Sequence, residues 1–197
     1  MIIRSLSAVF AAVFAGLFSA PAPVAAETAT QVTVSTSKGD FAIALDAARA
    51  PKTVANFLRY VRAGHYDGTV FHRVIPQFMV QGGGFAAEGF NEKPTGRTIR
   101  NEADKTGRNA VGTVAMARTS DPHSASAQFF INTNDNTHLD HRAKTARGWG
   151  YAVFGRVVRG MEVVRAIEAV ATRDAGPYQN VPVEPVVIRS IKVGGGK

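Results

Sequence analysis

The chain contains no cysteine among its 197 residues, so neither a disulfide framework nor thiol chemistry is available to it. Its five histidines include no H-E-x-x-H pair, and no G-x-S-x-G motif occurs. These absences disfavour a zinc hydrolase of that type and a serine hydrolase. Beyond the N-terminal region, no apolar run is long enough to cross a bilayer.

The first residues predict export. Arg4 precedes an apolar run over residues 6–20, and small residues follow up to Ala26. That order is typical of a secretory signal peptide, and an uncleaved membrane anchor is the alternative. We expect cleavage after Ala26, which makes residues 1–26 the signal peptide and residues 27–197 a single domain. No stable membrane association is expected after cleavage.

The charge is strongly basic, with a formal net value of +8. A basic surface can indicate a nucleic-acid or anionic-lipid partner. Here the lysines and arginines are scattered, with no run of five or more and no recognisable nucleic-acid motif. We therefore interpret the charge as an ordinary solvated surface and expect no nucleic-acid partner.

Hydrophobic patterning predicts many short strands and two helices. Alternating or apolar strand signals occur at residues 32–36, 41–45, 70–75, 79–82, 111–117, 128–132, 153–158 and 186–193. Pro51 opens a helix that Gly64 closes, and residues 161–170 form a second, shorter one. The glycine-rich stretch over residues 82–107 is predicted to be mostly loop. This order favours an antiparallel barrel over a βαβ repeat.

Residues 71–83, with the sequence F-H-R-V-I-P-Q-F-M-V-Q-G-G, set one arginine among apolar residues and glutamines. The block holds no carboxylate, cysteine, serine or lysine, so it is a poor metal or nucleophile site. It suits an apolar slot in which a fixed cation meets a neutral polar group of the ligand. Because side chains alternate along a strand, Met79 and Gln81 share one face, and Gln128 and Phe130 share another.

This block resembles the signature of the cyclophilins, the cyclosporin-binding family of peptidyl-prolyl cis-trans isomerases. Residues 112–118 (G-T-V-A-M-A-R), 127–132 (A-Q-F-F-I-N) and 151–157 (Y-A-V-F-G-R-V) carry the same resemblance in the same order. The similarity runs from about residue 31 to residue 193 and is greatest to the bacterial, periplasmic branch. It implies a mainly β fold, a closed eight-stranded antiparallel β-barrel capped by two α-helices. With the predicted signal peptide we expect a periplasmic protein, and we further expect a monomer without cofactor or metal.

The resemblance assigns a site residue by residue. It implies that Arg73 is catalytic and that Gln81 orients it and meets the substrate backbone. The substrate-binding residues that it implies are Phe78, Met79, Ala117, Arg118, Gln128, Phe130, His138, Leu139 and Tyr151. Of these, Phe78, Met79, Phe130 and Leu139 would line a proline pocket, and Arg118 would offer backbone groups. Phe78 and Met79 are adjacent, so the chain must bend after Gln77 if both are to reach one pocket.

The implied function is rotation about X–Pro bonds in exported or unfolded polypeptides, which assists folding without a covalent intermediate. A non-catalytic proline-binding chaperone module is the alternative, and a third possibility is an acid–base or metal enzyme that uses the histidines. Weak metal binding by His138, Asp140 and His141 belongs to that third possibility. Many eukaryotic cyclophilins have tryptophan where His138 stands, so weak cyclosporin binding is expected.

For two residues of the signature block, a purely structural role is an alternative interpretation. Arg73 could be the partner in a structural ion pair, although no acidic residue occurs between Asp67 and Glu88. His72 is interpreted as a buried, hydrogen-bonded structural histidine.

Overall fold

The computed structural model describes residues 29–194. The predicted signal peptide, residues 1–26, lies outside the described residues. Within the described range the chain forms ten strands: β1 Gln31–Thr36, β2 Gly39–Leu45, β3 Thr69–Ile75, β4 Met79–Ala86, β5 Thr113–Met116, β6 Phe129–Asn132, β7 Val153–Arg159, β8 Thr172–Ala175, β9 Tyr178–Pro182 and β10 Val187–Gly194. The same range contains the helices α1 Pro51–Arg62 and α2 Met161–Glu168 and a 3₁₀ turn, η1 Thr137–Leu139.

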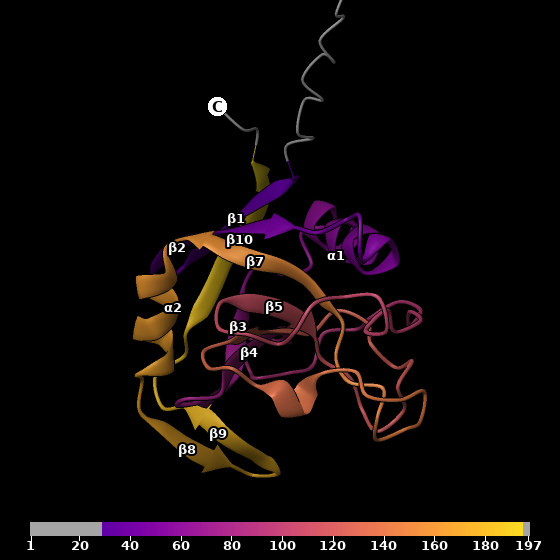
Figure 1. Cartoon of the computed structure of the whole chain (residues 1–197). Helices are drawn as coiled ribbons and strands as arrows, with labels where there is room; N and C mark the ends of the chain where they lie inside the picture. The colour runs from indigo at the N-terminus through magenta and orange to yellow at the C-terminus, as the bar shows by residue number, and fades with distance from the viewer. Residues whose placement is uncertain (1–28, 195–197) are drawn as a thin grey trace, which may run out of the picture.

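Eight of these strands close into a barrel in the order β1-β10-β3-β4-β6-β5-β7-β2, with antiparallel neighbours throughout (Figure 1). Closing the sheet leaves none of its edges unpaired. The helices α1 and α2 lie on different sides of the barrel. The predicted eight-stranded antiparallel barrel with two helices is therefore confirmed.

The barrel interior is filled by one alternating set of strand residues. Val80, Phe129 and Ile131 are fully buried members of the main core, to which α1 adds Phe57 and α2 adds Ile167. Because side chains alternate across a strand, the intervening residues of β4 and β6 point to the outer face of the barrel. That outer face positions the candidate site.

Two segments differ from the sequence expectation. The strand β4 continues through the glycines to Ala86, where the sequence predicted loop from residue 82. A hairpin of β8 and β9 forms a separate sheet that packs against β3 of the barrel, and it was not predicted. Its Tyr178 packs on Phe85 and Phe90, with ring centroids 5.1 and 5.4 Å apart. None of the helices between residues 29 and 194 is both long and apolar enough to span a membrane.

Candidate active site

A row of paired residues crosses four strands on the outer face of the barrel. Arg73 in β3 is paired with Gln81 in β4, and Gln81 is paired with Phe130 in β6. The row continues to Ala115 in β5, which is the partner of Phe130. Directly paired side chains of antiparallel strands point to the same face. The fold therefore places the only arginine of the signature block in one row with residues of two of the three other blocks.

A second apolar cluster, which we call the outer cluster, lies along this row and is separate from the barrel core. Its buried members are Met79, Ala115 and Phe130. The partly buried side chains packed against them are Ile75, Phe78, Ala117, Leu139, Tyr151 and Val153. Six of the predicted substrate-binding residues are thus brought together. Ile75, Ala115 and Val153 were missed, although Ala115 lies two residues from Ala117 and so had a signal in the strand period.

Glutamine side chains form the polar edge of the row. The Gln81 Nε2 donates to the Gln128 Oε1 at 3.0 Å, and the Gln128 Nε2 donates to the Glu92 Oε1 at 3.4 Å. Arg73 is half-buried, and no ion pair of its guanidinium occurs among residues 29–194. The interpretation of Arg73 as a structural ion-pair residue therefore has no support in the described part of the chain.

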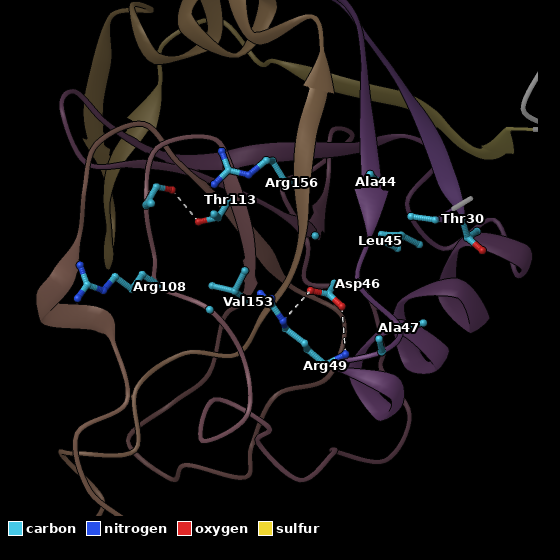
Figure 2. Close-up of a pocket in the computed structure, with 15 residues that line it drawn as sticks. Thr30, Ala44, Leu45, Asp46, Ala47, Arg49, Arg108, Thr113, Val153 and Arg156 are labelled. Atoms are coloured by element: carbon cyan, nitrogen blue, oxygen red, sulfur yellow. Dashed lines mark hydrogen bonds and ion pairs between the residues drawn. The ribbon is translucent and has the colours of Figure 1, made fainter. Parts of the chain in front are cut away.

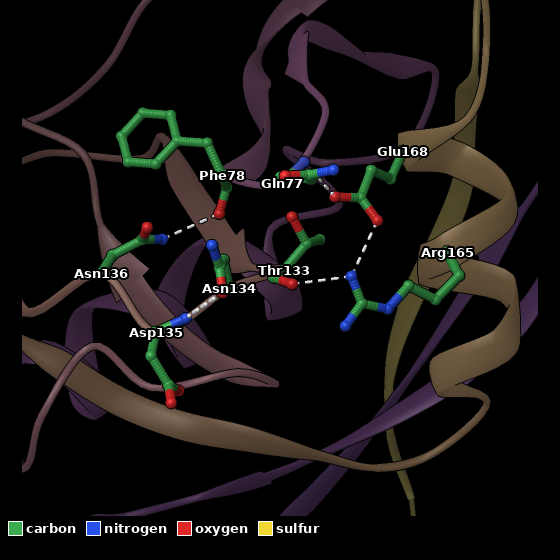
Figure 3. A network of polar contacts seen from close by, with 8 residues as sticks. All are labelled: Gln77, Phe78, Thr133, Asn134, Asp135, Asn136, Arg165 and Glu168. Atoms are coloured by element: carbon green, nitrogen blue, oxygen red, sulfur yellow. Dashed lines mark hydrogen bonds and ion pairs between the residues drawn. The ribbon is translucent and has the colours of Figure 1, made fainter.

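The turn between β3 and β4 supplies the bend that the sequence required at Phe78. The Phe78 N–H donates to the Ile75 carbonyl at 3.2 Å, and Gln77 takes a φ of 57°. The Phe78 carbonyl accepts from the Thr133 N–H at 3.0 Å and from the Asn136 Nδ2 at 2.8 Å (Figure 3). The backbone of Phe78 is thus fixed on both sides, and its ring joins the outer cluster.

The rim residues His138, Arg118 and Tyr151 surround the outer cluster. The His138 ring stacks on Phe78 with centroids 5.5 Å apart and an interplanar angle of 26°. The Arg118 guanidinium lies 4.6 Å from the centroid of the Tyr151 ring, and its Nε donates to the Gly150 carbonyl at 3.0 Å. The sequence predicted only backbone groups for Arg118. Its side chain in addition lies over the Tyr151 ring, which meets Phe130 edge-on at 5.6 Å.

The remaining histidines do not form a metal centre within the described residues. The His141 Nδ1 lies 2.8 Å from the Trp149 carbonyl, whereas the Asp140 carboxylate accepts from the Asn109 N–H at 2.7 Å. With His138 stacked on Phe78, the three groups have separate partners. No cluster of three or more potential metal ligands occurs between residues 29 and 194.

His72 precedes Arg73 in β3 and does not belong to the main barrel core. Burial is the main cause that lowers the pKa of His72 to about 4. The side chain is buried as expected, but the Nδ1 has no hydrogen-bond partner among the described residues. The expected burial is therefore confirmed, whereas no hydrogen bond is seen at the Nδ1 within residues 29–194. The ring instead packs on Phe85, with centroids 4.7 Å apart, so apolar contact holds it.

A cavity of about 570 Å³ lies elsewhere, between the end of β2 and the start of β7 (Figure 2). Arg49, Arg108 and Arg156 line it together with Asp46. None of the predicted site residues belongs to its lining. The cavity thus lies apart from the predicted site residues, although Val153 of the outer cluster also lines it.

Comparison with known proteins points to one family. The sequence model of the family described as "Cyclophilin type peptidyl-prolyl cis-trans isomerase/CLD" matches residues 31–193. A peptidyl-prolyl cis-trans isomerase of Streptomyces antibioticus is 58% identical over 164 residues, which is 83% of this chain and 98% of that protein. Peptidyl-prolyl cis-trans isomerase A of Dickeya dadantii is 54% identical over 86% of this chain and 87% of its own. Peptidyl-prolyl cis-trans isomerase B of Escherichia coli is 51% identical over 82% of this chain and 98% of its own.

Solved structures show the same fold. The crystal structure of a Cryptosporidium parvum cyclophilin type peptidyl-prolyl cis-trans isomerase superposes with a TM-score of 0.73 at 24% identity, covering 86% of this chain and 99% of that one. The structure of that protein in the presence of the dipeptide Ala-Pro gives a TM-score of 0.71 at 25% identity, covering 84% and 99%.

Proposed function

Because the chain belongs to the cyclophilin type peptidyl-prolyl cis-trans isomerases, it is an isomerase of X–Pro peptide bonds, and we propose that Arg73 and Gln81 carry the reaction on the outer face of the barrel. The non-catalytic chaperone alternative is therefore wrong. Proline-containing peptides are the substrates that the family implies. The observation that carries the site proposal is the row that aligns Arg73 with Gln81 and Phe130 beside the outer cluster.

The chemical task sets what these residues must supply. Resonance in the C–N bond gives an X–Pro bond a rotation barrier of ~18–20 kcal/mol, and uncatalysed exchange takes ~10–100 s. A turnover of ~10³ s⁻¹ corresponds to a barrier of roughly 13 kcal/mol, so catalysis must supply about 6 kcal/mol. No covalent bond breaks, and no proton needs to leave the substrate. The catalytic groups therefore act through binding that strengthens in the twisted state.

Arg73 acts on the proline nitrogen. During rotation this nitrogen loses conjugation, becomes pyramidal and gains a usable lone pair. A guanidinium held beside it donates a hydrogen bond that is strong only in the twisted state. A fixed donor of this kind contributes about 3–4 kcal/mol in comparable sites. Gln81, paired with Arg73 and bonded to Gln128, orients the guanidinium and meets the substrate backbone.

The outer cluster supplies the remainder by holding the proline ring. Phe78, Met79, Phe130 and Leu139 form the walls of an apolar slot, and Tyr151 lies at its rim. Gln128 and Ala117 flank the residue before proline, and Arg118 offers backbone groups there. With the ring fixed, the backbone on its other side turns about the X–Pro bond. By holding the ring still, the apolar side chains thus restrict the motion to rotation about the X–Pro bond.

Substitution of Arg73 tests the proposal. We expect Arg73→Ala to lower the exchange rate at saturating peptide by about 10²–10³-fold, because it removes the transition-state donor. Arg73→Lys keeps the charge but loses the planar fork, and it should recover only part of the rate. Two-dimensional exchange NMR on an X–Pro peptide measures the rate without a coupling protease. The exposed Arg156, beside the separate cavity, provides the matched control Arg156→Ala.

The pH profile distinguishes arginine from histidine chemistry. A guanidinium keeps its charge throughout the accessible range, so the rate should be nearly flat from about pH 6 to pH 8. An inflection near 6.5, loss of activity with EDTA, or full activity of a folded Arg73→Ala variant would each contradict the proposed mechanism.

We further propose that the isomerase is exported to the periplasm as a monomer and acts there on exported or unfolded polypeptides. The composition of residues 1–26 supports this location, and a chain without cysteine is compatible with it. Intact mass of the protein from a periplasmic extract tests it, since cleavage after Ala26 removes residues 1–26. His138 offers an imidazole where an indole would hold cyclosporin, so weak cyclosporin binding is part of the same proposal.

A further inference from the structure

The turn that carries Phe78 contains a strained residue. In the segment Ile75–Phe78 a proline occupies the second position and Gln77 the third, with the Phe78 N–H bonded back to Ile75. A turn of this kind can have a negative φ at the third position (type I) or a positive one (type II), and only the type II form favours glycine there. Gln77 has a φ of 57° and carries a side chain. Something outside the turn must therefore stabilise its conformation.

The stabilising contact comes from α2, which is distant in sequence. The Glu168 Oε1 accepts a hydrogen bond from the Gln77 N–H at 2.6 Å (Figure 3). Glu168 belongs to the last turn of its helix, where the dipole disfavours a carboxylate. Its side chain is only 11% exposed. Helix stability therefore does not explain why a carboxylate is buried at this position.

Arg165 completes the contact. Its Nη1 donates to the Glu168 Oε2 at 2.8 Å and to the Thr133 carbonyl at 2.7 Å. The Thr133 N–H in turn donates to the Phe78 carbonyl. Burial alone would raise the pKa of Glu168, but the hydrogen bonds from the Arg165 guanidinium and the Gln77 N–H help to lower it. The carboxylate is thus held charged against the turn.

We propose that Glu168 is a positioning residue of the isomerase, which fixes the turn through the Gln77 N–H and thereby sets the place of Phe78 in the proline slot. The proposal rests on the proposed function, because it takes Phe78 as a wall of that slot. Glu168 does not touch the substrate. Its effect falls on ring binding, whereas that of Arg73 falls on the saturated rate.

The test is the affinity of an X–Pro peptide, measured by NMR titration, beside the exchange rate at saturation. We expect Glu168→Ala to weaken binding by roughly fivefold and to leave the saturated rate within about twofold, because a misplaced slot wall removes uniform binding. The Met79 methyl resonance, next to Phe78, should shift in the free protein. Glu162→Ala is the matched control, since Glu162 is an exposed carboxylate of the same helix.

Rescue separates positioning from general stability. Glycine at position 77 adopts the turn without help, so Gln77→Gly in the Glu168→Ala background should restore affinity to within about twofold of the wild type. If Glu168 only stabilised the fold in general, Gln77→Gly would not restore the affinity for the peptide. If Glu168→Ala does not fold, Glu168→Gln replaces it as the test. We then expect Glu168→Gln to bind the peptide more weakly and the double variant Glu168→Gln/Gln77→Gly to recover the affinity.

Three outcomes overturn the proposal. The first is unchanged affinity in a folded Glu168→Ala variant, and the second is weakened affinity that Gln77→Gly does not restore. The third concerns the slot itself and uses Phe78→Ala in the same titration. If Phe78→Ala binds the peptide as tightly as the wild type, the proposed slot is wrong and the positioning role falls with it. If Phe78→Ala binds weakly and Glu168→Ala does not, only the positioning role is wrong.

Discussion

Two adjacent glycines of β4, Gly83 and Gly84, lie behind the candidate site and exclude a side chain for different reasons. A Cβ on Gly83, whose φ is +84°, would lie 2.8 Å from the Tyr66 ring and 3.1 Å from the Phe129 ring in the core. A Cβ on Gly84 would instead lie 2.5–2.6 Å from the Nε2, Cδ and Cγ of Gln128. Core rings cannot move away, whereas an extended glutamine side chain can.

The two alanine variants should therefore behave differently. Gly83→Ala should lower the free energy of unfolding by about 2–4 kcal/mol, through strain and overpacking. Gly84→Ala should cost less than about 1 kcal/mol but displace Gln128 from Gln81, and weaken binding of an X–Pro peptide by roughly fivefold. Urea denaturation and NMR titration measure the two quantities.

A double variant checks that the Gly84 effect passes through Gln128. In the Gln128→Ala background, Gly84→Ala should have almost no further effect on peptide affinity, because the displaced side chain is already absent. Additive losses in affinity would show that Gly84 acts by another route. The cycle also tests the proposed role of Gln128 at the residue before proline.

His72 makes stability depend on pH without entering the reaction. Its folded-state pKa of about 4 lies below the usual value of 6.5, so the unfolded chain binds the proton more readily. The folded state is thus fully favoured above pH 6.5 and loses up to about 3 kcal/mol as pH falls toward 4. We expect His72→Gln to flatten this decline, as measured by urea denaturation between pH 4 and pH 7. His65, whose pKa burial also lowers, remains in both proteins. Equal slopes would refute the assignment to His72.

At the scale of the element, α1 begins without a capping side chain of its own. Ala50 occupies the N-cap and makes no side-chain hydrogen bond. The buried Glu102 replaces it from a distant loop. Its Oε2 accepts from the Thr53 N–H at 2.9 Å and from the Thr53 hydroxyl at 2.8 Å, and its Oε1 accepts from the Lys52 N–H at 3.3 Å. The carboxylate also meets the positive end of the helix dipole.

Removal of this distant cap should weaken the fold and spare the site. We expect Glu102→Ala to lower the free energy of unfolding by about 2–3 kcal/mol, because buried N–H and hydroxyl donors lose a charged acceptor. Glu102→Gln should cost roughly half as much. Peptide affinity at low temperature should not change. Glu88, an exposed carboxylate on another loop, gives the control Glu88→Ala. A loss no larger than that of the control would mean that water caps the helix equally well.

Elements with a local cause were predictable from the sequence. Pro51 fixed the start of α1, and apolar alternation located the barrel strands. The hairpin of β8 and β9 was missed because Thr172–Ala175 is short and carries Arg173 and Asp174 without alternation. The extension of β4 was hidden because glycines show no hydrophobic period. In each case a contact with another element decides the structure.

The candidate site divides in the same way. The face shared by Met79 and Gln81 follows from the strand period alone. Which residue lies opposite Arg73 depends on the register of β3 and β4, which shifts at two irregularities between Val70 and Arg73. The contact of Glu168 joins residues that are 91 positions apart in the sequence, and the contacts of Glu102 join residues up to 50 positions apart. Nothing local in the sequence indicates such long-range pairs.

At the scale of the whole molecule, the two ends of the described chain meet. Gln31 and Gly194 are paired across β1 and β10, and Figure 1 shows the two strands side by side where the chain enters and leaves the barrel. The hairpin of β8 and β9 forms a separate sheet that packs against β3 of the barrel at the end opposite this seam. Its turn, Gly176 and Pro177, is exposed. These features predict where the chain can be cut and rejoined.

A circular permutant tests that arrangement. A short glycine-rich linker between residues 194 and 31, with new ends between Gly176 and Pro177, should fold and bind an X–Pro peptide within about threefold of the wild type, because exposed turns tolerate new ends. New ends between Pro76 and Gln77 should weaken binding by more than about tenfold, because the turn that holds Phe78 is lost. NMR titration of the two permutants makes the comparison with the same linker in both. Strong loss in the hairpin permutant would mean that β8 and β9, through Tyr178 and Phe85, support the site as closely as the β3–β4 turn does.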